Sequence, residues 1–416
     1  MQPENLRNLF NSLISSPQDV QYLFDIASGF RELGEFDKAN RALELLLELE
    51  PSNAESIYWL SMQNKSIIGT DIASQIEASL TKNAYGPNEL SYIYFAAARL
   101  REQQHCWDDA FAFYERANSF HKQALCLWNT DAVHYLDQCE FAERMDREWR
   151  IFIENSSYEE KFSNLVDQGE DLVFIVGLPR CGSTLVETIL AMAAESVPLG
   201  EVGFLATAIR ESNILSVLQA DPKDFDLYWR CLAQFADGYR EVVTNYPTAS
   251  DPNSSIFLDK TLINFLYLGL AARVWPKAKF IHVERHPLDQ IISAWRARFK
   301  EGHYFCLELN ALTKVYIAYS KLMEYWHSIL GERIYKCIYE ELASRPVVVT
   351  KELAGFCDLD WCAELMEPHS SKRLIKTGSF QQVRQPINAS SIGGWRNYEN
   401  QLKDCILLLN NAGISI

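Results

Sequence analysis

Several features that would point to common protein classes are missing from this sequence. None of its ten cysteines forms a Cys-x-x-Cys pair, which argues against zinc-ribbon and dithiol redox sites. No apolar run approaches about eighteen residues, so we expect no membrane span. Positive charge is also scarce, because 39 Lys and Arg face 55 Asp and Glu, for a net charge of -16. A general nucleic-acid binder needs a cationic face, and we therefore expect no nucleic-acid partner.

Signals for export and for metal binding are missing as well. The first residues, MQPENLRNLFNSL, hold no cationic segment followed by a long apolar stretch, so we expect no signal peptide. Scattered cysteines without a disulfide framework fit a reducing compartment, which favours a cytoplasmic protein. None of the eight histidines falls in a metal-spaced cluster. We therefore expect no bound metal and structural roles for the histidines, including His282 within a predicted strand.

The first 150 residues read as one helix after another and contain no convincing strand. The clearest unit spans residues 20–51, where small residues allow two helices to approach closely and Gly34 permits the turn between them. This unit resembles a tetratricopeptide repeat, and two weaker units start near residues 54 and 91. We therefore predict a helical tetratricopeptide-like repeat domain over residues 1–150, with a generic helical bundle as the alternative.

From residue 165 onward the pattern changes, and short apolar runs alternate with helical stretches. This alternation predicts a P-loop-like α/β domain with a central parallel sheet over residues 165–416, after a linker near 148–164. The predicted strands are Leu172–Val176, Ile256–Leu258, Lys279–Val283 and Arg333–Ile338. The predicted helices lie near 184–195, 202–215, 225–245, 262–275, 288–299 and 308–330.

The segment DLVFIVGLPRCGSTL, residues 171–185, predicts an anion site. It combines a buried strand, a loop bracketed by Gly177 and Gly182, and a helix that begins at Ser183. Amides of such a loop and the first N–H groups of the helix converge on one point, where the helix dipole favours negative charge. A nucleotide-hydrolysing P-loop has a lysine directly after the second glycine, whereas this chain has Ser183 there and Arg180 inside the loop. A nucleotide kinase or NTPase is therefore the less favoured alternative.

A second cationic position follows the predicted strand Lys279–Val283. Arg285 lies at the C-terminal end of this strand, and Ser293 follows eight residues later on the next helix. Ligands of open α/β sheets bind outside the C-terminal ends of the strands. We therefore expect Arg285 and Ser293 to reach the anion held by the first loop or a second phosphate beside it. Arg296 and Arg298 add positive charge one turn further on.

Together these segments resemble the donor-binding elements of the sulfotransferases. Residues 179–184, PRCGST, resemble the 5′-phosphosulfate loop of that family, and Arg285 with Ser293 resembles its 3′-phosphate pair. With the helical repeats, the chain resembles a bacterial group of tetratricopeptide-repeat sulfotransferases related to protein-tyrosine sulfotransferases. The resemblance implies the nucleotide donor 3′-phosphoadenosine-5′-phosphosulfate (PAPS). The donor-binding residues that it implies in these segments are Arg180, Cys181, Gly182, Ser183, Thr184, Leu185, Arg285 and Ser293.

The resemblance extends to four further short segments. Gly200-Glu201 resembles the pair that carries the general base of the tyrosine-type branch, and Asp259-Lys260 resembles the pair whose lysine stabilises the transition state. Tyr339 resembles the tyrosine that lies against the adenine. The ten residues from Ser379 to Asn388 resemble a loop that closes over the donor. The implied catalytic residues are Glu201, Lys260 and Arg180, and Tyr339, Ser379 and Asn388 complete the implied donor contacts.

The function expected from this resemblance is transfer of a sulfonate group from PAPS to a hydroxyl acceptor, with tyrosine in a protein or peptide as one candidate. Ala297 and Gly394 replace basic residues of the tyrosine enzymes, which leaves the acceptor open. We expect the repeats to bind a protein or peptide partner or the acceptor. Every implied donor contact lies after Gly177, so we do not expect the repeats to take part in donor binding. A non-catalytic repeat adaptor with a relict domain is a further alternative.

Overall fold

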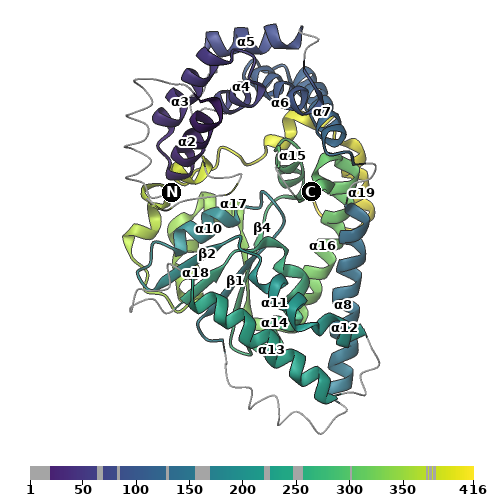
Figure 1. The fold of residues 1–416 in the computed structure, drawn as a ribbon. Coiled ribbons are helices and arrows are strands. Elements are labelled where there is room, and N and C mark those ends of the chain that lie inside the picture. Colours follow the sequence, from purple (N-terminus) through teal and green to yellow (C-terminus); the bar gives the residue numbers. More distant parts are fainter. Residues whose placement is uncertain are drawn as a thin grey trace.

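In the computed structural model, helices form an arch at one end of the molecule and an α/β body lies below it (Figure 1). A C-terminal segment returns to the region between them. The structure describes residues 19–62, 69–81, 85–127, 131–154, 169–219, 225–246, 256–299, 302–371, 373, 377 and 381–416.

The arch begins with a helical hairpin, α2 (Val20–Leu33) and α3 (Phe36–Leu49). Gly34 forms the turn with a φ of 79°, a conformation that glycine adopts without strain. The small residues Ala27 and Ala39 are buried between the two helices, as the sequence predicts. The arch continues through α4 (Ala54–Ser61), α5 (Thr70–Leu80), α6 (Pro87–Gln103) and α7 (Trp107–Ala124). The helical character is confirmed, and the assignment to the tetratricopeptide class stays a prediction.

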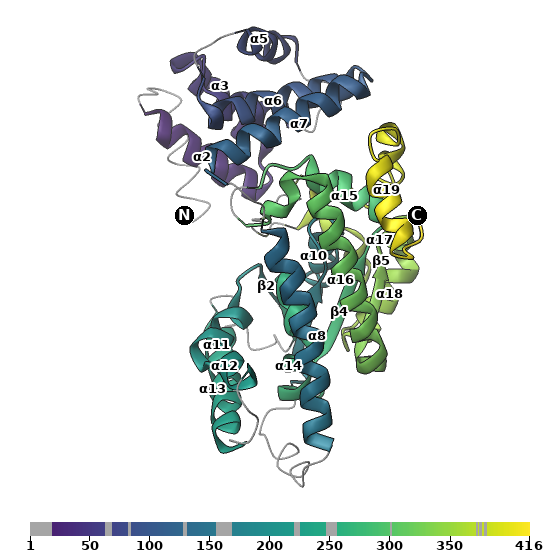
Figure 2. The same cartoon turned by 90° about the vertical axis from the view of Figure 1, so that its right-hand side faces the viewer.

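A long helix, α8 (Ala132–Glu154), leaves the arch and runs along the α/β body beside α16 (Leu309–Leu330), as Figures 1 and 2 both show. The predicted linker is therefore helical from residue 148 to Glu154, and its remaining residues lie outside the described part of the chain. We refer to helices α2–α8 together as the helical half. No described helix combines the length and the apolar character that crossing a bilayer requires.

The α/β body is built on a parallel sheet whose described strands follow the order β2-β3-β1-β4-β5. Four of these strands were predicted, but β2 was not, because the sequence SVPLG contains proline and glycine and no sustained apolar run. The predicted helix 184–195 ends at Leu190, and the chain then turns into β2. The strands are β1 (Leu172–Val176), β2 (Ser196–Gly200), β3 (Ile256–Asp259), β4 (Lys279–Glu284) and β5 (Ile334–Ile338).

Helices cover both faces of the sheet, because alternate residues of each strand point to opposite faces. Phe174 of β1 belongs to one cluster with α13 (Phe225–Thr244), α14 (Leu268–Val274), α16 and α8. Its neighbour Val173 belongs to the other cluster, with α10 (Ser183–Leu190) and α18 (Pro346–Phe356). The remaining helices are α11 (Phe204–Ser212), α12 (Ile214–Gln219), η2 (Leu262–Tyr267), α15 (Pro287–Trp295), η3 (Tyr304–Leu307), η4 (Gly331–Arg333), α17 (Tyr339–Ser344), η5 (Ala363–Met366), η6 (Pro368–Ser370), η7 (Gln382–Arg384), η8 (Gly394–Tyr398) and α19 (Lys403–Asn411).

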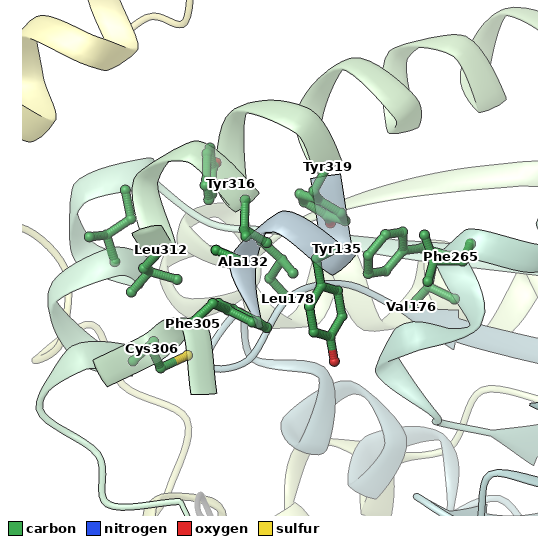
Figure 3. Close-up of a cluster of buried hydrophobic side chains, with 14 of the residues drawn as sticks. Ala132, Tyr135, Val176, Leu178, Phe265, Phe305, Cys306, Leu312, Tyr316 and Tyr319 are labelled. Carbon is green, nitrogen blue, oxygen red and sulfur yellow. The ribbon is translucent and has the colours of Figure 1, made fainter. Parts of the chain in front are cut away.

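The helical half and the α/β body share one hydrophobic core. A continuous cluster of buried side chains runs from Ile26 of α2 through the sheet to Leu409 of α19. Figure 3 shows a part of it, in which Tyr135 of α8 lies among side chains from both sides of the boundary. The ring of Tyr135 is 4.7 Å from that of Phe305, and Leu178, in the loop after β1, belongs to the same cluster. The start of α8 thus shares its core with the loop that follows β1.

Candidate functional site

The loop between β1 and α10, residues 177–182, is tightly folded and requires both of its glycines. A Cβ atom on Gly177 would lie 2.7 Å from the sulfur of Cys181 and 3.0 Å from the carbonyl oxygen of Val283. Gly182 has a φ of 106°, and a Cβ atom there would lie 2.5 Å from the ring of Tyr339. Each glycine therefore lets the loop approach a neighbour that any side chain would displace.

The loop leads into α10, whose first residues are buried at the C-terminal edge of the sheet. Ser183 and Thr184 are both 4% exposed, and the Thr184 hydroxyl lies 3.1 Å from that of Thr377. The first N–H groups of a helix have no partner within the helix. Burial raises the pKa of the Cys181 thiol just before this turn, so it is neutral. The start of α10 thus offers amide donors and no negative side chain.

Arg180 contributes the positive charge of this loop. Its Nε donates a hydrogen bond to Ser293 Oγ at 3.1 Å, and its Nη2 donates to Gln382 Oε1 at 2.8 Å. Burial lowers the pKa of Arg180 to about 10, and the nearby Arg285 and Arg296 lower it as well. Arg180 is still a cation at neutral pH, but three arginines lie close enough to repel one another. An anion at this place would relieve that repulsion.

Arg285 is nearly buried beside Arg180. Its Nη1 donates to the carbonyl oxygen of Arg180 at 3.1 Å, and its Nη2 donates to the carbonyl oxygen of Ser391 at 2.7 Å. Its guanidinium carbon lies 4.9 Å from the ring centre of Tyr339, whose hydroxyl is 2.7 Å from Ser391 Oγ. The Nε of Arg285 is buried without a hydrogen-bond partner among the described residues. A buried donor without a partner is rare in native proteins, and this Nε is available to a group that binds in the pocket.

A pocket opens where these residues meet, and the residues around Gln382–Ser391 form its other wall. Ser293 contacts this group through its hydrogen bond with Arg180. Cys181 is buried within the loop, and Ser183 is buried at the start of α10. Ser379 lies outside the described residues. The sequence analysis did not single out Gln382 or Ser391. They contact Arg180 and Arg285, respectively, from more than a hundred residues away, and no local sequence pattern predicts such contacts. The implied donor residues that line the pocket are Arg180, Gly182, Thr184, Leu185, Arg285, Tyr339 and Asn388.

A second charged group lies at the ends of β2 and β3, which pair with each other. The Nζ of Lys260 donates a hydrogen bond to Glu201 Oε1 at 2.5 Å. The Lys260 side chain is 0% exposed, whereas that of Glu201 is 40% exposed. The neighbouring strands therefore bring together the two residues to which the resemblance assigns transition-state stabilisation and proton removal.

Buried polar groups fix the backbone around this ion pair. Asp259 accepts hydrogen bonds from the Tyr239 hydroxyl and the Thr261 amide, both at 3.0 Å, and burial raises its pKa. Glu187 of α10 accepts one from the amide of Gly200 at 2.9 Å, which secures the turn into Glu201. The strand ends are thus rigidly placed.

The two charged groups both lie near the loop residue Cys181 in space. Lys260 and Arg285 are both within electrostatic range of the Cys181 thiol, and their positive charges lower its pKa, although burial raises it more. His303 lies within electrostatic range of Glu201, and its Nδ1 is buried without a partner among the described residues.

From the sequence we expected only structural roles for the histidines, and His282 has such a role here, between His327 and Tyr319. The described residues contain no cluster of three or more His, Cys, Asp or Glu suited to a metal ion.

Residues 172–363 match the model of the sulfotransferase family, and this segment therefore carries a sulfotransferase family domain. An uncharacterized protein of Aquifex aeolicus (strain VF5) is 26% identical over 406 residues, which are 95% of this chain and 51% of that protein. The chain thus spans about half the length of this relative.

Two solved structures are similar to the chain. One is the sulfotransferase domain from the Synechococcus PCC 7002 olefin synthase, with a TM-score of 0.44 and 20% identity, covering 60% of this chain and 97% of that one. The other is a mouse sulfotransferase complexed with PAP, with a TM-score of 0.37 and 17% identity, covering 62% of this chain and 90% of that one.

Proposed function

We propose that this protein is a sulfotransferase that transfers a sulfonate group from PAPS to a hydroxyl acceptor. One observation carries the proposal. Within the segment that matches the family, the half-buried Arg180 and the buried Arg285 line a pocket near a lysine–glutamate ion pair. The pocket supplies positive charge for an anionic donor, and the ion pair supplies a carboxylate that can take a proton.

The donor is expected to bind with its two phosphate groups at different parts of the pocket. The Arg180 guanidinium and those amides of the loop and of the first turn of α10 that have no backbone partner would hold the 5′-phosphosulfate. Arg285, with its unpartnered Nε, and Ser293 would hold the 3′-phosphate. Tyr339, packed against Gly182, offers an aromatic surface to the adenine. Contacts from Ser379 and Asn388 stay predictions.

In the proposed reaction the bond between sulfur and the bridging oxygen of the donor breaks, and a new sulfur–oxygen bond forms to the acceptor. The acceptor hydroxyl gives its proton to Glu201, and 3′-phosphoadenosine 5′-phosphate leaves. Lys260 lies beside Glu201, where its charge would stabilise the negative charge that grows on the leaving phosphate. A sulfonate carries less charge than a phosphoryl group, so Arg180 and Lys260 together suit the transfer.

The acceptor and the location of the protein belong to the same proposal. We propose that the helical half binds a protein or peptide, either the acceptor itself or a partner, because stacked helix pairs present a concave face. Tyrosine is one acceptor of the required chemistry, and a cytoplasmic location fits the scattered thiols. A nucleotide kinase is disfavoured, because Ser183 occupies the position of the P-loop lysine.

Calorimetry tests donor binding directly. We expect 3′-phosphoadenosine 5′-phosphate to bind the full-length protein equally well with and without a chelator of divalent metals. Tight binding of ATP with magnesium, and no heat from the bisphosphate, would overturn the proposal. Labelled PAPS offered with peptides, polysaccharides and simple phenols would then identify the acceptor class.

A further inference from the structure

Helix α15 connects the two parts of the donor pocket. It begins directly after Arg285 and His286, and it carries Ser293 in its last turn. Gln290 donates hydrogen bonds to the carbonyl oxygens of Leu178 and Pro179, at 3.0 and 3.2 Å. The position of α15 therefore sets the position of the loop 177–182 as well as that of Ser293.

The first turns of α15 are held by the α/β body and by the C-terminal segment. The amide of His286 donates to Glu340 Oε1 at 2.9 Å. Asp289 accepts hydrogen bonds from the amides of Gly393 and Trp395, at 2.6 and 2.9 Å. These contacts fix one end of the helix only.

The last turn of α15 is enclosed by the helical half. Asn118 of α7, which is buried, donates to the carbonyl oxygen of Trp295 at 3.0 Å. The Trp295 ring lies 4.6 Å from that of Phe111 of α7. Arg296, the C-cap of α15, forms an ion pair with Glu102 of α6. The end of α15 that carries Ser293 thus depends on helices that precede the α/β body in the sequence.

Glu102 is equipped to hold Arg296 in one place. Its carboxylate also accepts hydrogen bonds from the hydroxyls of Tyr114 and Tyr398, at 2.9 and 2.6 Å. Burial opposes the charged form of Glu102, but Arg296 and the Tyr398 hydroxyl outweigh that effect and leave its pKa below the ordinary value. A carboxylate with three donors from three different elements has little freedom to move.

We propose that Glu102 of the helical half is a positioning residue of the donor site, which acts through Arg296 to hold α15 and with it Ser293 and Arg180. The helical half then helps to shape the donor site, in addition to any surface that it offers to a partner. This inference rests on the proposed function, because it presumes that the pocket binds the bisphosphate.

The test measures the affinity of the full-length protein for 3′-phosphoadenosine 5′-phosphate by calorimetry. Glu102→Gln preserves the shape of the side chain and removes its charge, and we expect affinity to fall about tenfold. Simple electrostatics predicts the opposite result, since removing a negative charge near an anion site would tighten binding. Glu102→Asp keeps the charge and lets the long Arg296 side chain follow, so we expect it to stay within about threefold of the wild type.

Glu115→Gln on the exposed face of α7 is the matched control and should bind like the wild type. Should Glu102→Gln fail to fold, Tyr398→Phe removes only one hydroxyl from the carboxylate and is expected to weaken binding about threefold. Wild-type or tighter binding by Glu102→Gln, or by Tyr398→Phe in that case, would overturn the inference. Equal loss in Glu102→Asp and Glu102→Gln would overturn it too. A wild-type protein that does not bind the bisphosphate would instead overturn the proposed function.

Discussion

Two ion pairs near the pocket have similar chemistry and very different surroundings. In the Lys260–Glu201 pair the carboxylate is 40% exposed, and among the described residues Lys260 is its one hydrogen-bond partner. In the Arg296–Glu102 pair the carboxylate is 19% exposed and accepts two hydroxyl donors as well. Glu201 therefore has free lone pairs and access to an acceptor, whereas those of Glu102 are engaged.

This difference indicates that the Glu201 carboxylate is suited to accept a proton and that the Glu102 carboxylate is suited to keep its neighbours in place. A general base must reach its proton and be free to accept it. A positioning group must have its hydrogen bonds satisfied, since a half-satisfied buried charge is strongly destabilising. The α/β body thus carries the pair that we propose to react, and the boundary with the helical half carries the pair whose hydrogen bonds are satisfied.

Removing the helical half should have the largest effect of the changes considered. It deletes Glu102 of one ion pair and leaves Lys260 and Glu201 of the other pair in the chain. We expect a chain that starts near residue 160 to aggregate and to lose bisphosphate binding. The truncation would expose Phe305 and Trp295, which pack against Tyr135 and Phe111. Light scattering and calorimetry would measure the outcome. A soluble, monomeric fragment with wild-type affinity would support the division of labour that the sequence alone indicates.

Glu201→Gln tests the reactive pair. We expect turnover to fall about a hundred- to ten-thousand-fold, because the amide cannot take the acceptor proton. Affinity for the bisphosphate should change little, since Glu201 lies outside the pocket lining. Sulfonate transfer from labelled PAPS and calorimetry give the two readouts. Glu211→Gln, on the exposed side of α11, is the control, and normal turnover in Glu201→Gln would assign the proton transfer to another group.

Arg285→Ala tests the end of the pocket that we propose to bind the 3′-phosphate. We expect the bisphosphate to bind about 2–3 kcal/mol more weakly, because the change removes a charge-assisted contact from a buried place. The loss includes the support that Arg285 gives to the carbonyl oxygens of Arg180 and Ser391. Calorimetry measures it, with Arg210→Ala at an exposed position of α11 as the control. Unchanged affinity would remove Arg285 from the site.

The smallest expected effect concerns stability, away from both ion pairs. Burial lowers the pKa of His282 well below its ordinary value, and the nearby His327 and Lys336 lower it further. The folded protein therefore keeps His282 neutral, while the unfolded chain takes up a proton below about pH 6.5. The stability contributed by neutral His282 is present above that pH and is lost as the pH falls.

Urea unfolding at a series of pH values would measure this effect. The free energy of unfolding should fall by up to about 1.4 kcal/mol per pH unit for this one group below pH 6.5. His282→Gln should reduce that slope. An unchanged slope in the variant would mean that His282 takes up its proton equally in both states.

Much of the proposed donor pocket could be predicted, because its elements are local in sequence. A strand, two glycines and a helix start within residues 171–185 determine the loop, and the position of Arg285 after β4 follows from the rule for strand ends. The missed strand β2 shows where local reasoning is weak, since it exists through its pairing with β3 and not through its composition. Glu201 was therefore expected from resemblance and not from its place in the sheet.

By itself, then, the sequence determined the helical first part, the parallel α/β body, the loop between β1 and α10 and the candidate residues Arg180 and Arg285, and its resemblance to a family added Lys260. Only the tertiary structure decided that Lys260 pairs with Glu201 and that Glu102 reaches Arg296, 194 positions away. The physical reason is the distance along the chain over which each kind of interaction acts. Backbone preferences and periodic patterns act over a few turns of chain, whereas these contacts depend on how whole helices pack on a shared core.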